Sequence, residues 1–412
     1  MVKTSRDPAA LIALEERHGA RNYAPLNVVI TEAQGVWATD VEGRPFLDCI
    51  SGYSALSHGH AHPRIVAALV AQAQRLALTS RAVRNDRLGP FLERLTQVTH
   101  QEAALPMNTG AEAVETAIKL ARRWGYVRKG IPRDAAEIVV FDGNFHGRTT
   151  TIVGFSSTER YRRGFGPFDG GFRRVPFDDI AALQAAAGER TCAVLLEPIQ
   201  GEGGVNVPRS GYLRTVRELC TERNVLFMAD EIQTGFGRTG DLFACDHEGV
   251  IPDVLIVGKA LGGGVYPVSA ALAPWRIMEL FEPGDHGSTF GGNPLACAVG
   301  EAALDVLLEE HLAERARHYG SLLLKRLREI RSPLVRHVRG RGLLIGVELT
   351  IPVHNVSEHL LDEGVLAKET RDNVLRLAPP LIVDDEHIDF IVHALTRALK
   401  REEEHANVSL RV

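Results

Sequence analysis

Lysine and surplus positive charge are both scarce in this sequence. Only seven of its 47 basic residues are lysines, and 52 acidic residues give the 412-residue chain a net charge of −5. Proteins that bind nucleic acid neutralise its phosphates with a basic surface, so we expect no nucleic-acid partner. The scarcity of lysine also leaves few candidates for any chemistry that needs a primary amine.

Long hydrophobic runs are absent. The run IVAALV at 65–70 is typical of the longest, whereas a membrane-spanning helix needs about 18 apolar residues. The N-terminal stretch MVKTSRDPAALIALEERHG carries acidic residues and no apolar segment of the signal-peptide type. Hydrophobic residues nevertheless make up 45% of the chain, which is typical of a globular protein. We therefore expect a cytoplasmic protein with no membrane partner.

Cysteine is sparse, and no CxxC pair occurs. The five cysteines are spread over the chain, at Cys49, Cys192, Cys220, Cys245 and Cys297. This spacing indicates reduced thiols in or near the core rather than a disulfide framework or a zinc site. The motifs HExxH, GxSxG and the phosphate-binding P-loop are also missing, so the sequence has no sign of the chemistry they serve.

Two motifs that are present favour a structural explanation. GFGRTG at 235–240 follows a predicted strand, but the turn-like DLFACDHEGV comes next, whereas a dinucleotide-binding fingerprint requires a helix there. HGHAH at 58–62 offers three alternating histidines, but its glycine, the following Pro63 and the lack of a nearby acidic ligand favour a loop before a helix. We predict no metal site.

The central part of the chain alternates short apolar runs with helical patterns. This alternation is typical of an α/β fold with a mostly parallel sheet flanked by helices. The clearest predicted strands are 137–141, 192–198, 225–230, 253–258 and 268–273. A helix is predicted over 111–124, where one face carries Val114, Ala117, Ile118, Ala121 and Trp124.

The two ends of the chain differ from this pattern. VWATDVEGRPFLDCI at 36–50 predicts a hairpin, and a long helical pattern from about 301 to 330 precedes two strand-like runs and a terminal helix. The two runs are GLLIGVEL and VLRLAP, at 342–349 and 374–379. We expect three parts, namely an N-terminal segment (1–55), a large α/β domain (56–300) and a small α+β domain (301–412). The N-terminal segment is expected to pack with the small domain.

Three features suggest chemistry when they are taken together. Thr109, Gly110 and Ala111 open a strong amphipathic helix, whose first N–H groups can bind a phosphate. Asp230 ends the predicted strand VLFMAD, where open α/β sheets bind ligands. Lys259 follows the next strand, DVLIVG, and its apolar and glycine neighbours would desolvate the amine and lower its pKa. Each feature alone has an ordinary structural explanation.

An anion cradle, an acid and a buried amine at one sheet edge meet the requirements of pyridoxal phosphate. Lys259 would form the Schiff base, and Asp230 would keep the pyridine nitrogen protonated so that the ring withdraws electrons. The helix that starts at residue 110 would hold the phosphate. The combination is far more specific than any one of its parts.

The sequence resembles the class III (ω-amino acid) aminotransferases of pyridoxal phosphate fold type I, and within them the ornithine δ-aminotransferase branch. The resemblance runs from about Ala20 to the last helix. The motifs that carry it are RNYAPL (21–26), SGYSAL (51–56), LPMNTGAEAVETAIKLARRWGY (105–126), GNFHGRT (143–149), EPIQGEGGV (197–205), LFMADEIQTG (226–235), GKALGGGVYPVSA (258–270), HGSTFGGNPLA (286–296), RGRGLL (339–344) and LRLAPPL (375–381).

The resemblance implies a role for each matching residue. Lys259 and Asp230 would be catalytic. Binding of the cofactor is implied for Thr109, Gly110, Ala111, Phe145, His146, Glu197, Asp230, Ile232, Gln233, Lys259, Ser288 and Thr289. In this scheme Phe145 and Ile232 cover the two faces of the ring, Gln233 contacts its hydroxyl group, and Thr289 completes the phosphate site of the neighbouring subunit in a homodimer.

Substrate binding is implied for Tyr23, Tyr53, Arg148, Glu202 and Arg376. A δ-transamination must accept ornithine, which places no carboxylate beside the reacting carbon, and then 2-oxoglutarate, which does. An arginine near that carbon must therefore be neutralised in one half-reaction and free in the other. Glu202, in a glycine-rich loop, is implied to pair with Arg376 and then release it, while Arg148 holds the distant carboxylate.

The function that the resemblance implies is transfer of the δ-amino group of L-ornithine to 2-oxoglutarate. The products would be glutamate and glutamate 5-semialdehyde, which cyclises to pyrroline-5-carboxylate. Other donors remain open, namely N-acetylornithine, lysine, 4-aminobutyrate or a specialised diamine, and so does a racemase or decarboxylase on the same scaffold. A non-catalytic homologue would require the loss of Lys259 or Asp230, and both are present.

Overall fold

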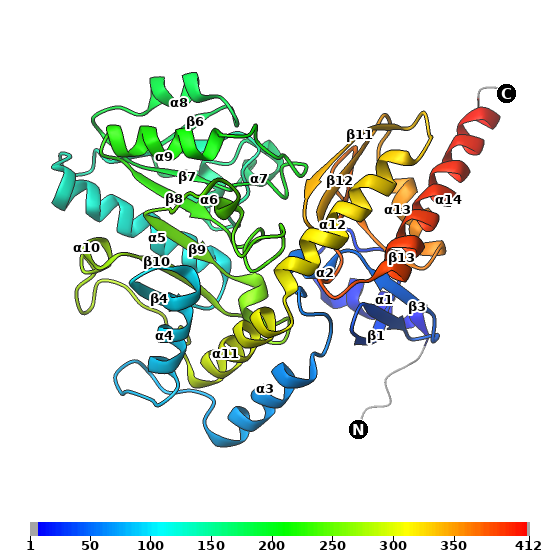
Figure 1. Ribbon diagram of the computed structural model, residues 1–412, viewed down its shortest axis with the longest axis horizontal. Coiled ribbons are helices and arrows are strands. Elements are labelled where there is room, and N and C mark those ends of the chain that lie inside the picture. Colours follow the sequence, from blue (N-terminus) through cyan, green and yellow to red (C-terminus); the bar gives the residue numbers. More distant parts are fainter. Residues whose placement is uncertain (1–6, 410–412) are drawn as a thin grey trace.

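The chain forms two lobes, and the larger one is organised around a seven-stranded sheet (Figure 1). The computed structural model describes residues 7–409. The strand order is β4-β10-β9-β8-β7-β5-β6, and β10 runs antiparallel to both of its neighbours while the remaining pairs are parallel. The strands are β4 (Ala103–Met107), β5 (Glu137–Phe141), β6 (Phe172–Val175), β7 (Thr191–Leu196), β8 (Leu226–Asp230), β9 (Val254–Val257) and β10 (Ser269–Ala273). All five strands predicted from the sequence are confirmed.

Helices cover both faces of this sheet. Along β5, Ile138 and Val140 belong to the apolar cluster that contains the inner face of α5, whereas Val139 and Phe141 belong to the cluster that contains α9. Burial on both faces explains why the central strands are continuous apolar runs rather than alternating ones. The helices of this lobe are α3 (Pro63–Arg75), α4 (Leu88–Thr99), α5 (Gly110–Trp124), α6 (Thr150–Gly154), α7 (Glu159–Arg162), α8 (Ile180–Ala186), α9 (Tyr212–Glu222), α10 (Trp275–Met278) and α11 (Pro294–Glu309).

The smaller lobe combines both ends of the chain in two four-stranded sheets (Figure 1). One has the order β1-β2-β3-β13 and the other the antiparallel order β11-β12-β15-β14. The strands are β1 (Ile30–Gln34), β2 (Trp37–Asp40), β3 (Pro45–Asp48), β11 (Val335–Arg341), β12 (Leu344–Leu349), β13 (Val365–Leu366), β14 (Lys368–Arg371) and β15 (Val374–Leu377). The helices are α1 (Pro8–His18), α2 (Ser51–Ser54), α12 (Leu312–Glu329), α13 (His354–Asp362) and α14 (Asp385–Ser409).

The elements of the smaller lobe agree in part with those predicted from the sequence. The hairpin expected in 36–50 forms as β2 and β3, and β3 pairs in parallel with β13. The helical pattern from about 301 to 330 is two helices rather than one, because His311 adopts a left-handed φ of 53° between α11 and α12. Residue 300 lies inside α11, and the division of the chain into three parts stays a prediction.

The motifs HGHAH (58–62) and GFGRTG (235–240) form hydrogen bonds and ion pairs with neighbouring parts of the chain. The histidines of 58–62 form hydrogen bonds or ion pairs with three different partners, namely the backbone oxygen of Ala303 and the carboxylates of Asp48 and Glu310. In GFGRTG the fully buried Arg238 donates to the backbone oxygen of Leu343 at 3.0 Å and to that of Pro379 at 2.5 Å. Burial lowers the pKa of Arg238 to about 9. This arginine therefore ties the two lobes together.

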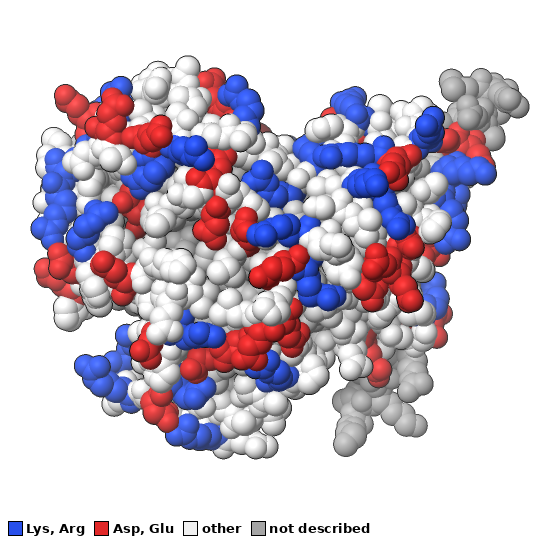
Figure 2. Space-filling view, in the orientation of Figure 1, with Lys and Arg blue, Asp and Glu red and all other residues white. Residues whose placement is uncertain are grey.

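The described cysteines are all buried and free, as the sequence predicted. Acidic and basic side chains are interspersed over the face of the molecule shown in Figure 2. Within residues 7–409 no helix is long and apolar enough to cross a membrane.

Candidate active site

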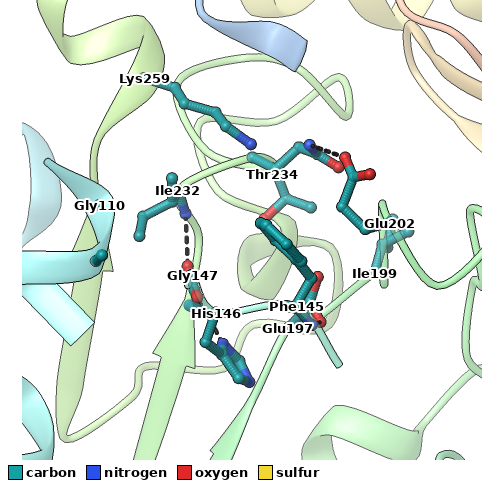
Figure 3. Close-up of a pocket in the computed structure, with 13 residues that line it drawn as sticks. Gly110, Phe145, His146, Gly147, Glu197, Ile199, Glu202, Ile232, Thr234 and Lys259 are labelled. Atoms are coloured by element: carbon teal, nitrogen blue, oxygen red, sulfur yellow. Dashed lines mark hydrogen bonds and ion pairs between the residues drawn. The ribbon is translucent and has the colours of Figure 1, made fainter. Parts of the chain in front are cut away.

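A cavity of about 210 Å³ lies at the carboxyl ends of three adjacent parallel strands. Glu197 follows β7, Asp230 ends β8 and Lys259 follows β9, so each contributes one functional side chain. The carboxyl edge of an α/β sheet is the usual place for a ligand site. Figure 3 shows the Lys259 amine at one end of the cavity and His146 at the other.

Lys259 is half-buried, and its amine lines the cavity. Burial lowers its pKa to about 8, against the opposing effect of the Glu202 carboxylate. An amine with this pKa is uncharged in about a tenth of molecules at pH 7, compared with a few in ten thousand for an ordinary lysine. Lys259 is therefore suited to act as a nucleophile and as a base.

Asp230 is held by two hydrogen bonds in a nearly water-free environment. Its Oδ2 is 2.6 Å from His146 Nδ1, and its Oδ1 accepts from the Ile232 N–H at 3.1 Å. Burial alone would lower the pKa of His146, but the bond to Asp230 outweighs it and raises the pKa. Among the described residues the other nitrogen of the ring, His146 Nε2, has no hydrogen-bond partner although it is buried.

Glu197 lies beside this pair. Its Oε2 accepts from the backbone N–H of Phe145 at 2.9 Å, and Phe145 lines the cavity. Burial raises the pKa of Glu197 to about 8, even though His146 acts in the opposite direction. A carboxyl group in this state is a neutral neighbour that does not compete with Asp230 for positive charge.

The first turn of α5 provides an anion site. Thr109 caps the helix, and the Glu112 carboxylate accepts from the N–H groups of Asn108 and Thr109, each at 2.9 Å. This capping box leaves the N–H groups of Gly110 and Ala111, which have no acceptor within the helix and line the cavity. Unpaired N–H groups at a helix N-terminus favour a phosphate or carboxylate.

A pair of opposite charges borders the other side of the cavity. The Glu202 carboxylate forms an ion pair with Arg376, which lies on β15 of the smaller lobe and is only 4% exposed. Gln233 donates to the same carboxylate at 3.3 Å, and the Arg376 guanidinium lies 5.0 Å from the centre of the Tyr53 ring. Burial would raise the pKa of Glu202, but Arg376 and Lys259 outweigh it and lower the pKa. The charge of Arg376 is thus masked in this conformation.

Arg148 lies near the cavity but does not line it. Its guanidinium is 3.8 Å from the centre of the Tyr161 ring and 5.4 Å from that of Phe145. Stacking on two aromatic rings holds a guanidinium with its donors still available.

The cavity brings together most of the residues predicted from the sequence. Those that line it are Gly110, Ala111, Phe145, His146, Glu197, Glu202, Asp230, Ile232, Gln233 and Lys259. Tyr53, Arg148 and Arg376 contact these residues from outside, and Thr109 caps the helix.

Three predicted residues are not brought into the cavity of this single chain. Tyr23 is 75% exposed, and Thr289 is also exposed. The hydroxyl group of Ser288 accepts from the Asn108 side chain at 2.8 Å, beside the start of α5. Their predicted roles therefore remain predictions.

Sequence reasoning missed four residues at this site. Gly147, Ile199 and Thr234 line the cavity, and Tyr161 stacks under Arg148. The first three lie inside motifs that carry the family resemblance, so proximity to those motifs was an available signal. Tyr161 lies in a short helix outside every motif, and only the folded chain places it there.

One group of possible metal ligands occurs among the described residues, away from these motifs. His359, Glu402 and His405 bring their ligand atoms within 4.8 Å of one another on α13 and α14. Glu402 lies 3.3 Å from His359 and accepts from the Asn355 side chain at 3.1 Å. His359 and Glu402 form an ion pair between the two helices when the histidine is protonated.

The chemistry available at the cavity is specific. The cavity is lined by the partly neutral amine of Lys259 and by Asp230, which is paired with His146. It also contains the anion site at the start of α5 and the ring of Phe145, and the masked Arg376 lies beside it. Such a set suits covalent attachment of a carbonyl compound that carries a phosphate, followed by proton transfers at a neighbouring carbon.

Comparison with known proteins gives matches over nearly the whole chain. The family model "Aminotransferase class-III" matches residues 18–399. An ornithine aminotransferase of Halalkalibacterium halodurans is 54% identical over 392 residues, which cover 95% of this chain and 98% of that protein.

Two solved structures are also similar. One is an ornithine aminotransferase of Toxoplasma gondii with partial occupancy of PLP at its active site, with a TM-score of 0.96, 43% identity and coverage of 97% of this chain and 96% of that one. The other is an acetylornithine aminotransferase from Elizabethkingia anophelis, with a TM-score of 0.88, 46% identity and coverage of 96% and 100%.

Proposed function

Because this chain belongs to the class III aminotransferases, we propose that it uses pyridoxal phosphate to transfer the δ-amino group of L-ornithine to 2-oxoglutarate. The products are glutamate and glutamate 5-semialdehyde, which cyclises to pyrroline-5-carboxylate. The observation that carries the choice of an ω-amine donor is the ion pair of Glu202 with Arg376 at the cavity. Relatives and a solved structure that bear the name ornithine aminotransferase support ornithine among such donors.

The residues of the cavity fit pyridoxal phosphate. The N–H groups of Gly110 and Ala111 would hold its phosphate, and the ring would lie between Phe145 and Ile232. Asp230 would hold a proton at the ring nitrogen, and His146 would orient the carboxylate. Gln233 Oε1 is buried without a hydrogen-bond partner among the described residues, which suits an acceptor for the ring hydroxyl group.

Pyridoxal phosphate, when bound, supplies an aldehyde that condenses with primary amines and a protonated ring that withdraws electrons from the adjacent carbon. Lys259 would provide the amine that holds the cofactor covalently. Its Nζ, when free, would be the group that moves a proton at the reacting carbon of the substrate. Its lowered pKa allows both steps near neutral pH.

The two arginines would distinguish the two substrates. While ornithine reacts through its distal amine, Glu202 neutralises Arg376 and no carboxylate is required there. When 2-oxoglutarate enters, its α-carboxylate displaces Glu202 and forms a charge-assisted pair with Arg376. Arg148, held over Tyr161, would bind the carboxylate at the far end in both cases.

A donor panel tests this proposal. The purified holoenzyme is incubated with 2-oxoglutarate and one amine at a time, and pyrroline-5-carboxylate is trapped when ornithine is the donor. We expect ornithine to give the highest kcat/KM. Higher kcat/KM for N-acetylornithine, lysine, 4-aminobutyrate or another diamine would contradict the proposal.

N-acetylornithine is the second candidate donor. The similarity to the acetylornithine aminotransferase of Elizabethkingia anophelis, at 46% identity, favours it over lysine and 4-aminobutyrate. In that substrate the α-nitrogen is the amide, so the reacting amine is again the δ-amine and no carboxylate lies beside the reacting carbon. The masked Arg376 therefore suits this donor as well as ornithine, and the donor panel, with N-acetylornithine as one of its amines, distinguishes the two.

The proposal includes a homodimer. Thr289 and Tyr23 are exposed in the single chain, and the segment with Ser288 and Thr289 lies beside the start of α5 through the contact of Ser288 with Asn108. A second subunit would bury these residues and complete the phosphate site. Sedimentation of the wild-type holoenzyme should show a dimer. A Thr289→Ala variant should retain pyridoxal phosphate more weakly than the wild type.

A further inference from the structure

The loop 201–206, which carries Glu202, has little rigidity of its own. Its residues include Gly201, Gly203 and Gly204, and Val205 adopts a φ of 53°. Left-handed backbone is unfavourable for a β-branched residue and persists only where the surroundings hold it. The position of Glu202 therefore depends on contacts made to this loop by the rest of the chain.

The larger lobe holds the base of the loop and contacts the Glu202 side chain, to which Gln233 donates at 3.3 Å. Gln200 and Asn206 exchange backbone hydrogen bonds of 3.1 and 3.0 Å across it. Gly201 permits a close approach to the cavity, because a Cβ atom there would lie 1.3 Å from Gln233 Oε1. Within the loop the Val205 N–H donates to the backbone oxygen of Gly201 at 3.2 Å. These contacts leave the carbonyl groups of Gly204 and Val205 to the smaller lobe.

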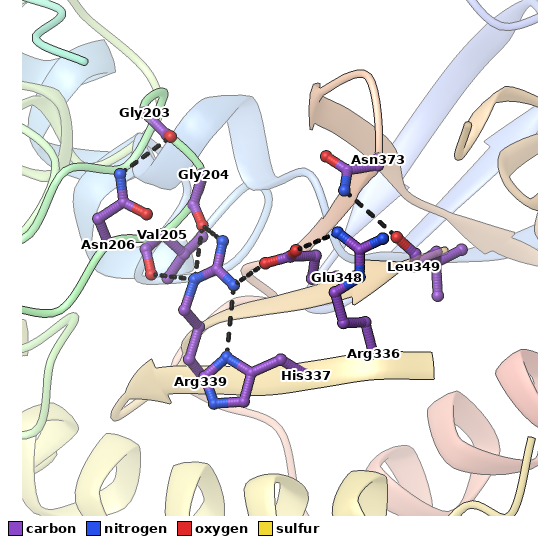
Figure 4. A network of polar contacts seen from close by, with 10 residues as sticks. All are labelled: Gly203, Gly204, Val205, Asn206, Arg336, His337, Arg339, Glu348, Leu349 and Asn373. Carbon is purple, nitrogen blue, oxygen red and sulfur yellow. Dashed lines mark hydrogen bonds and ion pairs between the residues drawn. The ribbon is translucent and has the colours of Figure 1, made fainter. Parts of the chain in front are cut away.

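The smaller lobe holds the part of the loop with the unfavourable backbone. Arg339 on β11 donates twice to the backbone oxygen of Gly204, at 3.0 and 2.7 Å, and once to that of Val205, at 3.1 Å (Figure 4). The Glu348 carboxylate accepts from the remaining arm of this guanidinium at 2.5 Å. One arginine thus fixes two successive carbonyl groups.

The strand register places this contact in line with Arg376. Gly346 on β12 pairs with Arg339 on one side and with Arg376 on the other. Residues directly opposite one another in antiparallel strands project from the same face. Val205 lies over the glycine between them, because a Cβ at Gly346 would be 3.0 Å from Val205 Cβ.

We propose that Arg339 and Gly346 are positioning residues that hold the loop 201–206 so that Glu202 meets Arg376, and that they thereby set the preference for ornithine over α-amino donors. This inference rests on the proposed function. Arg339 binds the loop backbone, Gly346 accommodates Val205, and Arg376 binds the Glu202 side chain, all within one row across the sheet. Loss of either positioning residue leaves Glu202 free to move away from Arg376.

Arg336 provides a matched control. It lies on the same strand and contacts the same carboxylate, with its Nη1 3.2 Å from Glu348 Oε1, but no hydrogen bond joins it to the loop among the described residues (Figure 4). The experiment compares Arg339→Met with Arg336→Met. The measurement is the ratio of kcat/KM for ornithine to that for glutamate, from half-reactions followed by cofactor absorbance.

We expect the ratio to fall by about tenfold or more in Arg339→Met and to change by less than about twofold in Arg336→Met. Arg339→Lys, which keeps the charge but can no longer reach both carbonyl groups as a planar fork, should give an intermediate ratio. Equal ratios in the wild type and Arg339→Met, or equal losses in the two methionine variants, would overturn the inference.

Hydrogen exchange separates this inference from the proposed function. Amides of 201–206 should exchange about tenfold faster in Arg339→Met than in the wild type, and at the wild-type rate in Arg336→Met. If the wild type fails to use ornithine, the proposed function fails while the exchange result still tests the positioning of the loop. If Arg339→Met does not fold, the kcat/KM ratio and the hydrogen exchange of 201–206 are measured on Gly346→Ala instead. This variant displaces Val205 without removing a charge.

Discussion

The two sides of the cavity are built in different ways. Lys259, Asp230 and Glu197 come from the ends of three neighbouring strands of one sheet, and their backbone is fixed by that sheet. Glu202 and Arg376 come from different lobes and meet only through a glycine-rich loop. The first arrangement suits groups that must stay in place through every turnover, whereas the second suits a pair that has to separate and reform.

This difference predicts how variants on each side should behave. Removal of a group from the strand ends should abolish the chemistry for all substrates alike. Removal of a group from the loop side should leave chemistry intact and change which substrate is preferred. Substitutions at Lys259, Asp230 and Glu202 test this division.

Lys259→Ala should reduce turnover by about 10⁴-fold or more with every amino donor, because both the nucleophile and the proton carrier are lost. The folded protein should still bind pyridoxal phosphate, without covalent attachment. Steady-state assays and absorbance spectra make the measurement. Lys325→Ala, at an exposed lysine of α12, is the matched control. Near-normal turnover of Lys259→Ala would refute the assignment of the cavity.

Asp230→Asn should reduce the single-turnover rate by about 10²- to 10³-fold for ornithine and for glutamate. The variant keeps the shape of the side chain but loses the charge that holds a proton at the ring nitrogen, and it weakens the contact with His146. Covalent attachment through Lys259 should persist. If the rates of both half-reactions are unchanged, Asp230 has only a structural role.

Glu202→Ala should lower the ratio of kcat/KM for ornithine to that for glutamate by about ten- to a hundredfold. Without the carboxylate, Arg376 stays free and favours any substrate with a carboxylate beside the reacting carbon. The half-reactions are followed separately by cofactor absorbance. A ratio that stays constant while both rates fall would place Glu202 with the strand-end groups and remove the distinction between the two sides.

A weaker effect, on the pH dependence of cofactor attachment, connects the two sides. Attachment of pyridoxal phosphate to the apoenzyme requires a neutral Lys259, so its rate should rise with pH and level off above about 8, where the amine is deprotonated. The charge of Glu202 raises the pKa of Lys259, so Glu202→Gln should move the midpoint to lower pH. The rate of attachment is measured by stopped-flow absorbance at a series of pH values on both sides of this midpoint. An unchanged midpoint would show that the two sides are electrostatically independent.

The strand-end side was largely predictable from the sequence. Lys259 and Asp230 directly follow apolar runs, and parallel strands bring such positions to one edge. The start of α5 was visible for the same reason, since Gly110 begins a regular amphipathic pattern. Local pattern and topology were sufficient, because each residue is positioned by the element to which it belongs.

The loop side was accessible only through resemblance to a family. Glu202 and Arg376 are 174 residues apart, and no periodicity connects them. Strands β11 and β14 were also missed, because VRHVRGR and KETR are charged and partly exposed. The role of Gly346 depends on a strand register and on a loop from the other lobe, and neither is encoded in a local pattern.

Arg238 has a consequence for how the molecule unfolds. Its guanidinium is fully buried, and its acceptors include Leu343 and Pro379 of one lobe, while its own backbone belongs to the other. Melting of one lobe alone would break these hydrogen bonds to a charged donor, each of which contributes about 1.5–3 kcal/mol. The lobes should therefore lose structure in a single cooperative transition, and a calorimetric scan should show one heat-absorption peak rather than two.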